Sequence, residues 1–169
     1  GVYDLVTDYS TIFENDNENN VESVFEIQYT DVEGAGFGCL QCSEGNVAVG
    51  FNGPRNFNGP LFESGFSFNV PTQEAADIYA PGDQRDAVTI LDIVEWADST
   101  GCTYSTGNEH TGYFNRKYLP RKRGEDAAGD QNLTNPNNYR AIRYSDVLLM
   151  AAEANNRGGI CDGKAQDYL

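Results

Sequence analysis

The sequence has few basic residues, a single histidine, a single tryptophan and no long apolar run. Only 11 Lys and Arg residues accompany 26 Asp and Glu residues, the net charge is −15, and the first base along the chain is Arg55. Binding to nucleic acid needs positive charge, so this balance argues against nucleic acid as a partner. No run approaches the length of about 20 apolar residues that a membrane-spanning helix needs.

The chain also lacks the residue patterns of common catalytic sites. His110 stands without a nearby serine or cysteine nucleophile pattern, which makes it weak evidence for catalysis. The glycine-rich segments are not followed by the Lys-Ser/Thr pair of a phosphate-binding loop. We therefore expect no enzyme activity, no cofactor and no metal site.

Residues 21–30 alternate between apolar and polar side chains, as a strand with one buried face does. Phe25 and Ile27 belong to the predicted inner face, whereas Glu22 and Glu26 share the outer face. A pair of carboxylates can carry out general acid-base chemistry. The outer half of an amphipathic strand has the same pattern without any catalytic role, and we prefer that interpretation.

The cysteines number four: Cys39, Cys42, Cys102 and Cys161. An even number permits disulfides if the protein is exported. The Cys39–Cys42 spacing matches a redox motif, but glycines precede it where a thioredoxin has a strand. A four-cysteine zinc site needs a second closely spaced pair, which is absent. Structural disulfides and free thiols both stay open, metal or redox chemistry ranks last, and the pairing is not decided.

The strongest helix pattern covers 143–157, within the stretch 138–159. Its apolar residues recur at helical spacing and form one face: Tyr144, Val147, Leu148, Ala151 and Ala152. Asp146 suits the first turn, Arg157 suits the last, and two glycines follow. We predict a helix whose residues Val147, Leu148 and Ala151 face a core.

Three segments have the composition of loops. Residues 31–67 are rich in Gly and Asn and carry five phenylalanines, and 97–111 form a second variable loop. A loop as long as 31–67 is uncommon in a compact domain unless it has a function. Residues 124–138 are polar, and we predict a mobile linker there.

The stretch 139–154 resembles the signature helix of the SusD/RagB family. The residues that carry this likeness read Tyr-Arg-Ala-Ile-Arg-Tyr-Ser-Asp-Val-Leu-Leu-Met-Ala-Ala-Glu-Ala. Three further segments match in the family's order, namely 20–29, 68–74 leading to 82–86, and 111–119. Together the four matches span nearly the whole chain. Because the relatives are much longer, we interpret the sequence as one middle-to-C-terminal fragment, 1–169.

The resemblance implies a mainly α fold with long irregular loops, a few short strands and tetratricopeptide-type helix packing around 143–157. It also implies non-catalytic capture of an oligo- or polysaccharide at the outer face of the outer membrane. The family delivers glycans to a SusC-like TonB-dependent transporter and is held by a lipid anchor, here expected upstream of the fragment. The alternative is a tetratricopeptide-like scaffold that contacts proteins without binding a ligand. A glycoside hydrolase is the less favoured third interpretation.

Glycan binding calls for aromatic rings that stack on sugars and for polar side chains that bond hydroxyl groups. Phe57, Phe62 and Phe66 are the predicted stacking rings, with Arg55 and Asn58 as hydroxyl contacts. Phe66 stands where relatives often have Trp in a Gly-Trp-Gly-Phe-Asn stretch. The competing interpretation is that these rings form a small core under the loop.

Overall fold

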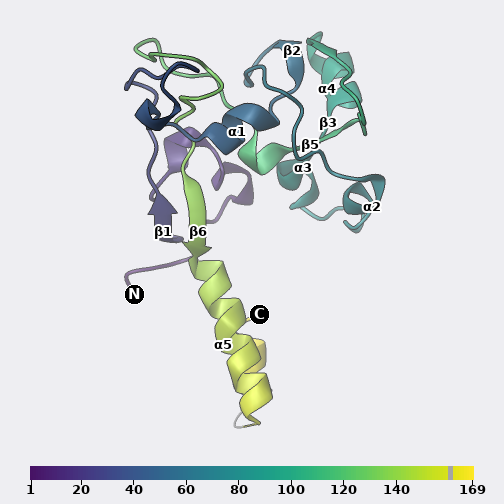
Figure 1. Ribbon diagram of the computed structural model, residues 1–169. Coiled ribbons are helices and arrows are strands. Elements are labelled where there is room, and N and C mark those ends of the chain that lie inside the picture. The colour runs from purple at the N-terminus through teal and green to yellow at the C-terminus, as the bar shows by residue number, and fades with distance from the viewer. Residues whose placement is uncertain (160–161) are drawn as a thin grey trace.

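A computed structural model describes residues 1–159 and 162–169 (Figure 1). Its helices are short apart from the fifth: α1 Val47–Asn52, α2 Gln73–Ala76, α3 Asp86–Thr89, α4 Ile93–Thr100, α5 Tyr144–Gly158 and α6 Asp162–Asp167. Its strands are β1 Ser23–Ile27, β2 Arg55–Asn58, β3 Ile90–Asp92, β4 Thr103–Ser105, β5 Tyr113–Asn115 and β6 Tyr139–Arg143. Four 3-10 turns complete the elements: η1 Tyr9–Thr11, η2 Asn15–Asn17, η3 Leu40–Cys42 and η4 Arg116–Tyr118.

The strands form three separate antiparallel pairs, β1–β6, β2–β4 and β3–β5. Each pair joins segments that are distant in sequence, so the pairs pin long irregular loops into one body (Figure 1). The expected long loops and short strands are therefore present. Helix is less prominent in this body than expected, because the longest helix, α5, projects from it.

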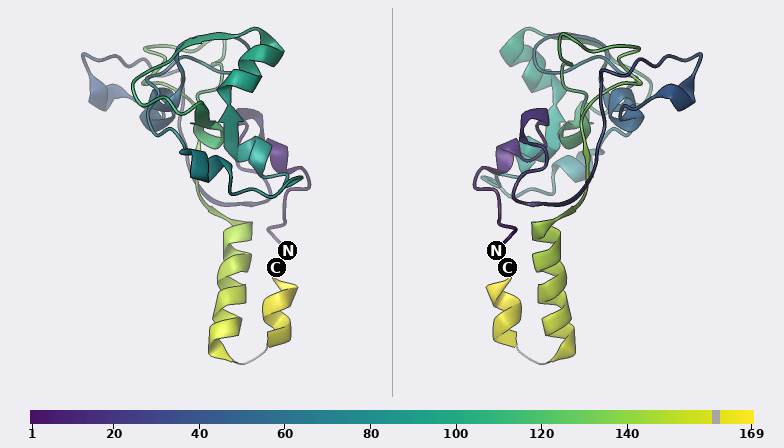
Figure 2. Two further views of the ribbon diagram at one scale, coloured as in Figure 1. Left: turned by 90° about the vertical axis from the view of Figure 1, so that its right-hand side faces the viewer. Right: turned by 90° about the vertical axis from the view of Figure 1, so that its left-hand side faces the viewer.

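Helix α5 covers nearly the predicted range, but it does not pack against a core as predicted. The backbone N–H of Arg143 donates to Asp146 at the N-terminus, and Gly159 ends the helix in the left-handed conformation. The helix leaves the body and packs antiparallel to α6 (Figure 2). Val147, Leu148 and Ala151 are consequently only half-buried, and our prediction that they face a core is wrong. No described helix is both long and apolar enough to cross a bilayer.

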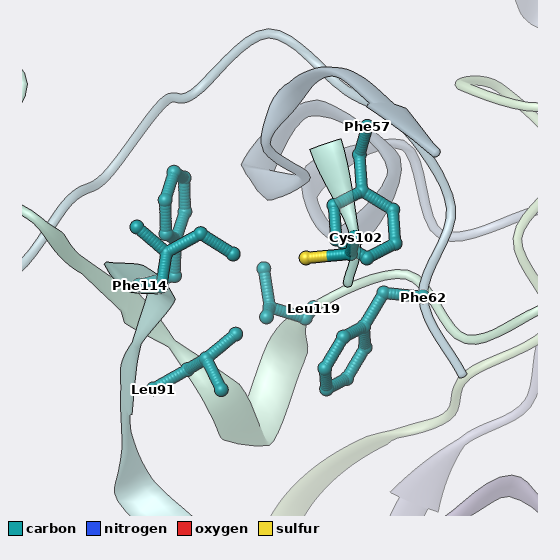
Figure 3. Close-up of a cluster of buried hydrophobic side chains, with 7 residues drawn as sticks. Phe57, Phe62, Leu91, Cys102, Phe114 and Leu119 are labelled. Carbon is teal, nitrogen blue, oxygen red and sulfur yellow. The ribbon is translucent and has the colours of Figure 1, made fainter. Parts of the chain in front are cut away.

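The main hydrophobic core lies in the body among β2, β3, α4 and β5, away from α5 (Figure 1), and Figure 3 shows its side chains. It consists of Phe57, Phe62, Leu91, Ile93, Cys102, Phe114 and Leu119. These residues come from β2, the segment after it, β3, α4, the link between α4 and β4, β5 and the turn after η4. The 31–67 segment thus contributes two phenylalanines to the core and is not solely a surface loop.

Strand β1 presents the face opposite to the one predicted. Phe25 is 55% exposed, whereas Glu22 is 3% exposed. The cause is a pair of arginines on β6, Arg140 and Arg143, whose side chains are largely buried. Arg143 Nη1 lies 3.0 Å from Glu22 Oε1, and the buried Arg140 lies 3.9 Å from Glu26. Buried carboxylates are tolerated when a charged partner accompanies them.

The second half of the predicted 124–138 linker is buried, so the prediction of a mobile linker is wrong there. Asn135 and Asn137 are 0% exposed, and Asn138 is 1% exposed. Their side-chain amides donate hydrogen bonds to three other segments: Asn137 to the Phe13 carbonyl, Asn138 to Gln28, and Asn135 to the Arg121 carbonyl. The Asn46 amide in turn donates to the Asn137 carbonyl at 2.9 Å. We call residues 133–138 the asparagine hub.

The N-terminal segment is fixed to the body by an ion pair. Nε and Nη2 of Arg121 donate to the two carboxylate oxygens of Glu14, each at 2.8 Å. Burial alone would raise the pKa of Glu14, but the hydrogen bond and charge of Arg121 outweigh burial and lower it. A two-point contact of this kind fixes orientation as well as distance.

The cysteines pair locally. A disulfide joins Cys39 to Cys42 in the loop that contains η3. Cys102 is buried in the core with a free thiol, and Cys161 lies outside the described residues. A bridge that closes so short a loop stiffens the loop without connecting distant parts of the chain.

The burial of Phe62 yields a stability test. Replacing this fully buried ring by alanine should lower the free energy of unfolding by about 3–5 kcal/mol, because it leaves a cavity in the core. Phe37→Ala is the matched control in the same segment, since that ring is 58% exposed, and its effect should stay within about 0.5 kcal/mol. Denaturant unfolding of both variants measures the difference. Equal effects would contradict the core described here.

Candidate functional site

A pocket of about 390 Å³ opens beside the start of β2. Two segments form it, one following Gly65 and the other belonging to the loop after β4. Its lining residues are Arg55, Phe66, Ser67, Phe68, Asn69, Val70, Asn108 and Glu109. We call this cavity the Arg55 pocket.

Aromatic rings form one wall of the Arg55 pocket. Phe66 and Phe68 both pack edge-on against Phe51, with ring centroids 5.3 and 5.9 Å away. The Arg55 guanidinium lies 5.9 Å from the centroid of the Phe66 ring. Phe68 is 52% exposed, so part of its ring faces solvent. A ring that is held on one side and open on the other is suited to stacking on a flat apolar surface.

The backbone under this wall is tightly constrained. The amides of Phe66 and Phe68 both donate to the Phe51 carbonyl, at 3.1 and 3.3 Å. Gly65 makes this approach possible, because a Cβ at that position would lie 2.5 Å from the Gly53 nitrogen. The rings are thus held by a close backbone contact that a side chain at position 65 would obstruct.

Three residues that line the pocket have left-handed backbone conformations. Ser67, Asn69 and Glu109 have φ values of 57, 54 and 57°. Such conformations are uncommon outside glycine, and they concentrate at functional sites where surrounding contacts over-determine them. Their clustering around one cavity distinguishes the Arg55 pocket from the rest of the described surface.

The polar side chains of the pocket are available for a ligand. Within residues 1–159 and 162–169, the side chains of Arg55, Asn69, Asn108 and Glu109 make no intramolecular hydrogen bond or ion pair. Together they offer amide and guanidinium donors beside amide and carboxylate acceptors. This combination matches the hydroxyl groups of a sugar, which both donate and accept hydrogen bonds.

The structure separates the five residues predicted from sequence. Arg55 and Phe66 both line the Arg55 pocket. Phe57 and Phe62 are 8% and 0% exposed in the hydrophobic core (Figure 3), so they have no face for a sugar. Asn58 is exposed at the other end of β2, opposite Thr103, and does not line the pocket.

Sequence reasoning missed four of the pocket's contributors: Phe68, Asn69, Asn108 and Glu109. Phe68 and Asn69 begin one of the segments that resemble the SusD/RagB family. Asn108 and Glu109 lie in the predicted variable loop 97–111. The sequence indicates this loop, but it does not indicate that the loop lies beside Phe66 and Phe68. The pairing of β2 with β4 brings the two loops together, and no local pattern announces this pairing.

A larger hollow of about 620 Å³ lies between α5 and α6. Leu149, Ala152, Ala165 and Leu169 line it together with polar helix residues, and none of its lining residues is aromatic. It has the character of an open helix-packing surface, and we do not assign the ligand site there.

Comparison with known proteins identifies a family and a common structure. The sequence model of the SusD family matches residues 10–169. A laminarin-binding SusD-like protein superimposes with a TM-score of 0.85 at 33% identity over 99% of this chain. Surface glycan-binding protein A from Bacteroides thetaiotaomicron, solved in complex with laminarihexaose, gives a TM-score of 0.88 at 30% identity over 99% of this chain. No curated protein sequence matches.

The chain spans less than two-fifths of these solved relatives. It covers 37% of the laminarin-binding protein and 38% of the Bacteroides thetaiotaomicron protein. Surface glycan-binding protein A from Bacteroides fluxus, at 27% identity and a TM-score of 0.81, is covered to 35%.

The Gly65 contact predicts a specific sensitivity of the pocket wall. Gly65→Ala should lower the free energy of unfolding by about 1–3 kcal/mol, because the new methyl group would overlap the backbone of Gly50 and Gly53. Gly38→Ala is the control, since a Cβ there meets nothing within 4 Å and should leave stability unchanged or slightly raised. Thermal unfolding of the two variants measures the difference in their stability. A tolerated Gly65→Ala would mean that the wall is looser than described.

Proposed function

The chain belongs to the SusD family, and from this premise we propose that it binds a glycan in the Arg55 pocket. The observation that carries the proposal is the combination in one cavity of a half-exposed ring, Phe68, with four polar side chains that have no described intramolecular partner. Rings stack on sugar faces, and the polar groups bond the hydroxyls. The laminarihexaose complex of a 30% identical relative supports glycan as the ligand class.

Delivery to a membrane transporter is the wider role that we propose for the whole protein. In this role the bound glycan passes to a SusC-like TonB-dependent transporter. In the same proposal, a lipid anchor holds the protein on the outer face of the outer membrane. The family membership and the surface glycan-binding relatives support this role.

Helices α5 and α6 support a second, compatible role in protein contact. They pack as an antiparallel pair (Figure 2), and Leu149 and Met150 of α5 are each 55% exposed. Tetratricopeptide-like units are helix pairs that bury their apolar faces by stacking on neighbouring units. We propose that this pair is one such unit and provides a packing surface.

We propose no catalytic role. The two carboxylates considered for acid-base chemistry, Glu22 and Glu26, are buried and lie beside Arg143 and Arg140. A general acid or base has to come within hydrogen-bonding reach of its substrate. The described surroundings of these carboxylates give a structural role instead, and the glycan-binding relatives are consistent with it.

Truncation of the exposed pocket ring tests the proposed function. Phe68→Ala should weaken glycan binding by about 1–3 kcal/mol, in line with the loss of other ring-stacking contacts, and should leave the fold intact. Laminarihexaose is the first probe, and isothermal titration calorimetry measures its affinity.

Phe37→Ala is the matched control for this test. Its ring has similar exposure, 58% against 52% for Phe68, but lies outside the pocket. Binding should be unchanged in this variant. Equal affinity of Phe68→Ala and the wild-type chain for a glycan that the wild type does bind would refute the assignment of the Arg55 pocket.

A further inference from the structure

The Arg55 pocket adjoins two further hollows, which share Asn69 with it. Asn69 also lines two further cavities, of about 360 and 170 Å³. Asn115 and Tyr118 line both of these cavities, so the two are neighbours of each other as well as of the pocket. We call the pair of hollows the Asn115 groove.

The asparagines of the Asn115 groove fall into two groups. Asn46 and Asn52 serve the fold, because the Asn46 side-chain amide donates to the Asn137 carbonyl and the Asn52 side-chain amide lies among the carbonyls of Ala48, Phe68 and Tyr118. The side-chain amides of Asn69 and Asn115, in contrast, have no hydrogen-bond partner among the described residues. The side-chain oxygen and NH2 group of these two asparagines can therefore bond the acceptors and donors of a ligand.

Aromatic rings accompany the free amides. Tyr118 and Tyr139 lie with their ring centroids 5.6 Å apart at an interplanar angle of 35°. Tyr139 is 47% exposed, and it lines the smaller hollow. The groove therefore repeats the composition of the Arg55 pocket, in which rings stand beside unbonded amides.

The charges along this path favour an uncharged ligand. Lys117 is the charged residue that lines the groove, and its ammonium lies 4.9 Å from the centroid of the Phe13 ring. Arg55 and Glu109 have opposite charges in the neighbouring pocket. The net charge of −15 adds repulsion of anionic chains.

We infer that the Asn115 groove is a second sugar subsite and that the ligand is a neutral oligosaccharide that crosses Asn69 and occupies both cavities. This inference rests on the proposed function and extends it. It requires affinity to increase with chain length, because a short oligosaccharide fills the Arg55 pocket alone. Residues of the groove then affect long ligands selectively.

The test compares variants across a series of ligand lengths. Affinity electrophoresis of the 169-residue chain against neutral and acidic polysaccharides first identifies the glycan class, and calorimetry then uses its oligosaccharides, beginning with laminaribiose to laminarihexaose. Asn115→Ala should weaken binding of the hexamer about 3- to 10-fold, the value of one hydrogen bond, and leave the dimer unchanged. Phe68→Ala should weaken both. Asn58→Ala, an exposed asparagine outside both cavities, should weaken neither.

Asn115→Asp guards against a loss of folding, because it keeps the side-chain shape while removing the amide donor. It should show the same selective loss with an unchanged melting temperature. Equal affinity of the wild type for dimer and hexamer would overturn the second subsite, as would equal loss for both lengths, or no loss, in the Asn115 variants. Retention by acidic polysaccharides alone would overturn the neutral ligand. No binding to any glycan would instead refute the proposed function itself.

Discussion

The structure depends on the hydrogen bonds of the asparagine hub, residues 133–138. Its amides and carbonyls bond the N-terminal segment, strand β1, the start of helix α1 and the segment around Arg121, which are all distant from it in sequence. Arg140 lies beside the hub and donates to Asn137 Oδ1 and to the Asn138 carbonyl. Buried polar groups of this kind stabilise a fold only when their partners are present, so the segments are mutually dependent.

Helix α1 connects the candidate site to the hub. Helix α1 begins at the hub, since the backbone N–H of Asn46 donates to the Asn135 carbonyl at 2.7 Å. The same helix packs its Gly50 directly against Asn132, where no side chain would fit. The same helix contains Phe51, whose carbonyl accepts hydrogen bonds from the backbone N–H groups of Phe66 and Phe68. The rings of the Arg55 pocket are thereby connected to the buried hub through one short helix and one close glycine contact.

The elements that the sequence predicts well are those with a local signal. Helix α5 has its periodicity and its terminal residues, and the motif from 139 to 154 identifies the family. The errors have a common cause, which is pairing between distant residues. Glu22 and Glu26 look solvent-exposed until Arg143 and Arg140 are placed beside them, and the hub asparagines look like a linker until their partners are known. Phe57 and Phe66 lie in the same segment, 31–67, yet one is in the core and the other lines a pocket.

Hydrogen exchange at the hub tests this account most directly. The backbone amides of Leu133, Thr134, Asn137 and Asn138 all donate to oxygens within the protein, so they should exchange about as slowly as the core strand residue Phe114. Glu125 and Asp126, exposed in the same polar segment, should exchange rapidly. Exchange of the hub amides as fast as that of Glu125 and Asp126 would show that the segment is a mobile linker and would contradict the account.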